Sequence, residues 1–130
     1  MSNKIRAVVI AVLMVPAVLV FVMDKTIVKA NTATIEGFVL DSACAFTKNL
    51  QKPISPQCAT ACAKAGSPLV ILTDDGNIYL PISKDTPATG QNAKLMPLAG
   101  QRVRATGKVY RRGGSRAIVV DKVETVAGGQ

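Results

Sequence analysis

Apolar and polar residues alternate over much of the chain beyond residue 30, which is the pattern of strands that bury one face. The clearest case is the segment 101–110, in which every second residue is apolar or glycine and its neighbours are mostly basic or polar. The β-branched segment 34–40 and the apolar segment 117–120, continued by Val123, are typical of further strands. These patterns predict a domain that is mainly β.

Two apolar runs, 69–72 and 78–82, flank the sequence Asp-Asp-Gly-Asn at 74–77. A glycine and an asparagine between such runs are a strong hairpin signal, so we expect the two runs to pair. A linker with two prolines follows, and the short segment 93–96 predicts a helical turn before the next strand.

One helix is expected between the first and second strands. Ser55 followed by Pro56 is typical of a helix start, and the helix should run through Lys64 and end at Gly66. The polar, proline-bearing stretch that precedes Ser55 predicts a loop.

Five strands with a helical element between the third and the fourth are the element order of an OB-fold, a small Greek-key barrel. The segments that carry a family resemblance are 37–44, 58–62, 98–109 and 117–124. In these segments the chain resembles small exported bacterial OB-fold-like proteins, whose functions are mostly uncharacterised. The resemblance spans roughly residues 34–124 and implies the fold rather than an activity. Some of those proteins carry a histidine shortly before the paired cysteines, where this chain has Pro56 and Gln57.

An uncharged apolar run begins at Ala7, contains Pro16 and ends at Met23, and it follows a short basic N-terminus. As a helix it would span about 25 Å, slightly less than the bilayer core, so a retained anchor and a cleaved signal peptide are both open. Val28 and Ala30 stand where a signal peptidase reads small residues, which predicts cleavage after Ala30 in the second case.

We therefore expect residues 1–30 to be a signal-anchor or signal peptide, 31–126 the OB-like barrel, and 127–130 a disordered tail. The predicted location is the inner membrane, in a single pass with the domain in the periplasm, or the periplasm itself if the leader is cleaved.

The chain has no histidine, which removes the commonest general base and metal ligand. We therefore expect no enzyme and no cofactor. The net charge is +8, and the first 30 residues account for +3 of it, which leaves +5 on the predicted barrel domain.

The residues with the clearest chemical potential are Cys44, Cys58 and Cys62. Cys58 and Cys62 share one helix face at a spacing that disfavours a bridge between them, so Cys44 is the better disulfide partner for either. Such a bridge would leave one cysteine buried or linked to another chain. The alternatives are three thiolates on one metal, with Asp41 or water as fourth ligand, and a redox role.

A basic face is predicted on the strand 101–110 and the turn that follows it. Its candidate partner-binding residues are Arg102, Arg104, Lys108, Tyr110, Arg111, Arg112 and Arg116. Such a face can be a solvated edge or can bind anionic lipid or an acidic protein surface. Nucleic acid is not the expected partner, because few aromatic residues are available for base stacking.

Together these features predict a non-catalytic, membrane-anchored periplasmic subunit that supports a larger membrane protein complex. The alternatives are a soluble periplasmic thiol, metal-binding or redox protein that uses the three cysteines, and an OB-type nucleic-acid-binding domain.

Overall fold

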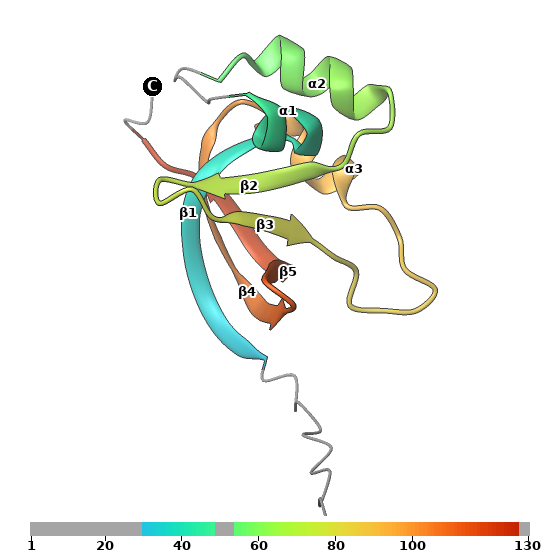
Figure 1. Ribbon diagram of the computed structural model, residues 1–130, viewed down its shortest axis with the longest axis vertical. Helices are drawn as coiled ribbons and strands as arrows, with labels where there is room; N and C mark the ends of the chain where they lie inside the picture. Colours follow the sequence, from blue (N-terminus) through green and yellow to red (C-terminus); the bar gives the residue numbers. More distant parts are fainter. Residues whose placement is uncertain (1–29, 49–53, 128–130) are drawn as a thin grey trace, which may run out of the picture.

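The computed structural model describes residues 30–48 and 54–127, and these form a five-stranded closed barrel with short helices at one end (Figure 1). The strands are β1 (Asn31–Asp41), β2 (Leu69–Thr73), β3 (Ile78–Pro81), β4 (Arg102–Arg112) and β5 (Ser115–Thr125). The helices are α1 (Ser42–Thr47), α2 (Pro56–Lys64), α3 (Asn92–Leu95) and the 3-10 turn η1 (Met96–Leu98).

The strand order around the barrel is β1-β2-β3-β5-β4, and β4 pairs with β1 to close it. All pairs are antiparallel except β3 with β5. The helical elements α3 and η1 stand between β3 and β4, as in the predicted fold. The expectation of a mainly β, OB-like barrel is therefore confirmed.

Strand β1 belongs to both halves of the barrel, because its first part pairs with β4 and its last part pairs with β2. Gly37 lies where the two pairings overlap, opposite both Thr73 and Val103. A Cβ at this position would come within 2.4 Å of the Leu72 carbonyl oxygen, so the close approach of the strands requires glycine.

The barrel encloses the main hydrophobic core. Val39, Ile71, Val103 and Ile118 contribute from four strands, and Leu95 of α3 packs into the same cluster. A second, smaller cluster lies under the helices and contains Leu40, Ala59, Val70 and Ala99, with Cys44 packed against it. The helices are thus held to the barrel by apolar contacts on the side where the cysteines lie.

The segment after β1 was expected to be a loop, and this expectation is wrong for residues 42–47, which form α1. The carboxylate of Asp41 caps this helix by accepting a hydrogen bond from the Cys44 amide. The barrel therefore carries two short cysteine-bearing helices rather than one. The expected helix at Pro56–Lys64 is confirmed, with the Ser55 hydroxyl accepting from the Cys58 amide at 3.2 Å.

Among the residues that the structure describes, no helix is long and apolar enough to cross a membrane. The predicted membrane segment, with Ala7, Pro16 and Met23, lies outside the described residues. Val28 of the predicted cleavage site lies outside them as well, and Ala30 is the first described residue.

Candidate functional site

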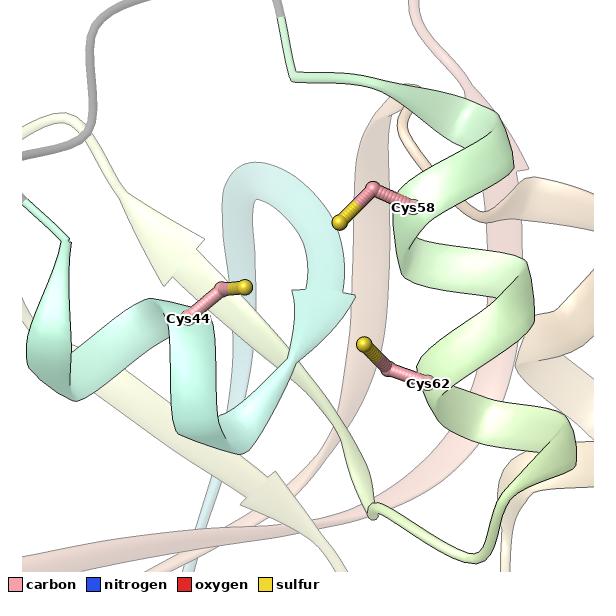
Figure 2. Close-up of side chains that lie close together, drawn as sticks. All are labelled: Cys44, Cys58 and Cys62. Carbon is pink, nitrogen blue, oxygen red and sulfur yellow. The ribbon is translucent and has the colours of Figure 1, made fainter.

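Three thiols from two helices meet at the end of the barrel. Cys44 comes from α1, whereas Cys58 and Cys62 come from successive turns of α2. Figure 2 shows the three side chains directed into the space between the two helices, and their Sγ atoms all lie within 4.8 Å of one another. All three are free thiols; Cys44 and Cys62 are half-buried and Cys58 is exposed.

Local sequence and packing explain why α2 presents its cysteines here. The Ser55 cap and Pro56 fix its start, and Ala59 and Ala63 bury the face that lies against the barrel. Gly100, which precedes β4, has a φ of +79° and allows close contact, since a Cβ there would lie 2.7 Å from the Pro56 Cα. The first turn of α2 is thereby held against the segment that leads into β4.

A buried carboxylate stands beside the thiols. Asp41 is 1% exposed, and its Oδ2 accepts the Cys44 amide hydrogen at 3.0 Å. Its Oδ1 is buried and has no hydrogen-bond partner within the described part of the chain. Burial acts to raise the pKa of Asp41, but the Cys44 amide and the side chains of Cys44 and Cys62 outweigh it and lower the pKa. The carboxylate is therefore charged at neutral pH.

Asp41 and burial together favour the protonated form of the Cys44 and Cys62 thiols. The hydrogen bond to Asp41, then burial and the charge of Asp41, raise the pKa of Cys44 to about 11. The pKa of Cys62 is raised by burial first and by the Asp41 charge second. Because the thiolate is the nucleophile in disulfide exchange, these pKa shifts disfavour Cys44 and Cys62 as nucleophiles. A bound cation would reverse the effect, since coordination deprotonates a thiol.

The spacing of the sulfurs suits a metal ion. In a tetrahedral zinc site with bonds of about 2.3 Å, two sulfurs lie about 3.8 Å apart, which small side-chain rotations would reach from the observed spacing. A disulfide between Cys44 and either partner requires a much shorter distance of about 2.05 Å, and the three thiols are free in this structure, so the predicted bridge stays a prediction. Asp41 lies beside Cys44 and Cys62, but the group of mutually close ligand atoms contains the three sulfurs alone.

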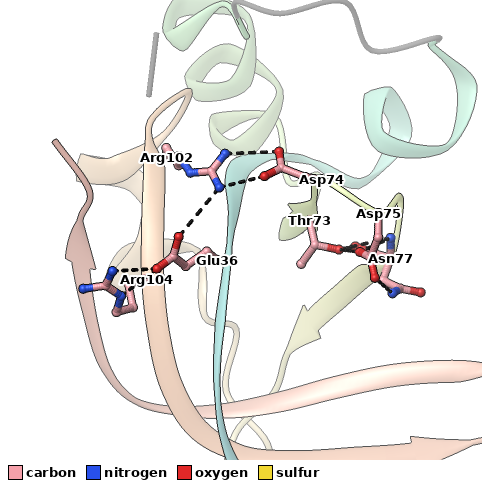
Figure 3. Close-up of polar contacts among 7 residues, drawn as sticks. All are labelled: Glu36, Thr73, Asp74, Asp75, Asn77, Arg102 and Arg104. Carbon is pink, nitrogen blue, oxygen red and sulfur yellow. Dashed lines mark hydrogen bonds and ion pairs between the residues drawn. The ribbon is translucent and has the colours of Figure 1, made fainter. Parts of the chain in front are cut away.

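The structure divides the predicted basic face into two parts. Arg102 donates to both oxygens of Asp74, at 3.1 and 2.7 Å, and lies 3.7 Å from Glu36 (Figure 3). Arg104 contacts the same glutamate, with its Nε donating to Oε1 at 2.8 Å. Glu36 of β1 faces Arg104 of β4 in register, so this pairing required knowledge of which strands are neighbours. These two arginines are therefore largely neutralised.

The second part lies on the hairpin that joins β4 and β5. We name it the hairpin cluster and define it as Lys108, Arg111, Arg112 and Arg116. No carboxylate in the described ranges forms an ion pair with a member of this cluster. Tyr110, also predicted to bind a partner, is half-buried and lies opposite Ala117 of β5.

Comparison of the chain with known protein families, with curated proteins and with solved structures finds no match in any of the three. The functional argument accordingly depends on the chemistry of the thiols, of Asp41 and of the hairpin cluster.

Proposed function

We propose that this protein binds a thiophilic metal ion of the zinc class through Cys44, Cys58 and Cys62. The observation that carries the proposal is the convergence of three sulfurs, from two consecutive helices, to within 4.8 Å of one another. Three thiolates and a fourth position for water or an outside ligand are a known zinc arrangement.

Charge also favours a divalent ion at this position. Three thiolates beside the Asp41 carboxylate would repel one another strongly without a cation, because like charges at close range disfavour the charged form. A divalent ion offsets more of this negative charge than monovalent copper would. Asp41, with its unpartnered Oδ1, would then lie beside the ion and contribute attraction rather than destabilise the thiolates.

The test is zinc titration of the fully reduced, full-length protein against a chromophoric chelator, with native mass spectrometry to count bound ions. We expect one zinc per chain. Replacing any one cysteine by serine should weaken binding by about 100-fold or more, because a direct ligand is lost and even an outer-shell partner is worth about 10–100-fold in affinity. Cobalt in place of zinc should give the charge-transfer absorption of thiolate ligands.

Asp75→Asn serves as the control, because this exposed turn carboxylate bonds to Thr73 and Asn77 and lies outside the thiol group. It should leave zinc affinity unchanged. A reduced protein that binds no zinc would refute the proposal, and loss of the mass of two hydrogen atoms on mild oxidation would then favour the disulfide.

We also propose, as a second function, docking onto a larger membrane protein complex. The observation in its favour is a groove of about 420 Å³ that is lined by residues of α1, β2, β3 and the start of β5 and includes Arg116 of the hairpin cluster. Phe46, 76% exposed, and Leu80, 42% exposed, line it together with Val70, Ile78 and Arg116. Apolar side chains beside unpaired arginines suit a partner segment that is both apolar and acidic.

The docking proposal is tested by capture from native membranes in moderate salt. Phe46→Ser combined with Arg112→Glu should abolish an association that the unmodified chain makes. Arg104→Glu is the control, because Arg104 already pairs with Glu36. Equal loss with the control variant would remove the groove from the explanation.

A further inference from the structure

The hairpin cluster contains two arginines that face each other across the β4–β5 pair. Arg111 and Arg116 are directly opposite in the antiparallel register. Two positive side chains in this position lie about 5 Å apart at their Cβ atoms and destabilise the pair unless something neutralises them. Among the described residues, no carboxylate forms an ion pair with either arginine.

Both arginines belong to the inward-facing rows of their strands, at the end of the barrel. Arg111 follows the buried Val109 by two residues, and Arg116 precedes the buried Ile118 by two. Because side chains alternate along a strand, both arginines belong by position to the inward-facing rows, but at the barrel end Arg111 is exposed and Arg116 is half-buried. They are thus held on a rigid sheet rather than on a mobile loop.

The hydrogen bonds of the pair are incomplete. The Arg111 Nη2 donates to the Tyr79 hydroxyl at a long 3.5 Å, and Tyr79 itself stands beside Arg116 in the parallel pairing of β3 with β5. The Arg116 Nε is buried and has no partner within the described residues. A buried, unsatisfied donor on a charged group is costly, and it points to an acceptor that the protein alone does not supply.

From these observations we infer that Arg111 and Arg116, with the Tyr79 hydroxyl, form a binding site for a phosphate group. A tetrahedral oxyanion offers enough acceptor oxygens to bond to two guanidinium forks at once, which a single carboxylate does less well. Its negative charge would replace the repulsion between the arginines by attraction. The site is distinct from the thiol cluster and does not depend on metal binding.

The experiment is a ¹H–¹⁵N NMR titration of the reduced full-length protein with sodium phosphate, at constant ionic strength maintained with chloride. We expect saturable shifts centred on the amides of Arg111, Arg116 and Tyr79. Arg111→Gln should weaken phosphate binding at least tenfold. The fold should tolerate this substitution because Arg111 is exposed. Arg116→Gln and Tyr79→Phe, which removes only the hydroxyl, should each weaken phosphate binding as well.

The control is Arg104→Gln, which removes one arginine from the same strand but from an ion pair with Glu36. It should leave phosphate binding unchanged. Vesicles of phosphatidylglycerol, compared with phosphatidylcholine, distinguish the sources of the phosphate group. Binding to phosphatidylglycerol vesicles supports a lipid headgroup, and binding to free phosphate alone supports a soluble phosphate compound. Shifts no larger than those from chloride, or equal weakening by Arg104→Gln, would overturn the inference.

Discussion

Strands β4 and β5 approach each other closely at Gly107, and the substitution Gly107→Ala should force them apart and lower the stability of the fold. Gly107 is buried on β4, directly after an irregularity in the pairing with β5. A Cβ at this position would lie 1.9 Å from the Val119 carbonyl oxygen. An ordinary contact between carbon and oxygen is about 3.3 Å, so one strand would have to move by roughly 1.4 Å.

The loss in the free energy of unfolding depends on which atoms must move to admit the new methyl group. The obstructing atom is backbone, held in a ladder on both sides, so we expect the upper part of the overpacking range, about 3 kcal/mol. Alanine also restricts the unfolded chain more than glycine does, which stabilises the folded state by up to about 1 kcal/mol. The net loss in the free energy of unfolding is therefore about 2 kcal/mol. For a domain of about 100 residues this lowers Tm by roughly 8–16 °C.

The assay is thermal and urea unfolding followed by circular dichroism, with Gly90→Ala as the matched control. Gly90 lies in a loop without a positive φ, and a methyl group added there would meet no atom within 4 Å, so only the unfolded-chain effect applies. The control should unfold at or slightly above the Tm of the unmodified protein. A Gly107→Ala variant as stable as the control would refute the close packing of β4 on β5.

Three further predictions concern the carboxylate, the cap and the core. Asp41→Asn keeps an N-cap side chain but removes the charge that raises the Cys44 pKa. Alkylation of Cys44, followed by mass spectrometry of its peptide, should therefore reach its half-maximal rate at a lower pH than about 11. An unchanged pH profile would contradict the role of Asp41. Ser55→Ala removes the α2 cap and should cost about 1 kcal/mol in urea unfolding, and an unaltered midpoint would show that the cap is dispensable. Leu95→Ala in the core should cost about 2–5 kcal/mol, whereas Leu80→Ala on the surface should cost far less, and equal losses would argue against the position of α3.

Local patterns in the sequence were sufficient for most of the elements. The alternation before and after Val103 predicts β4 because a strand turns successive side chains to opposite faces. Ser55 and Pro56 predict the start of α2 because capping depends on neighbouring residues alone. Helix α1 escaped prediction, since it spans only six residues and its cap, Asp41, is also the last residue of a strand.

The candidate sites depend on contacts between residues that are distant in the chain, and local patterns carry no information about those. Cys44 reaches Cys58 and Cys62 because α1 and α2 pack on the same part of the barrel. Glu36 neutralises Arg104 because closure of the barrel places β1 beside β4. The sequence thus predicts which side chains can react or carry charge, while barrel closure selects which of them meet, because strand register sets distances that composition does not encode.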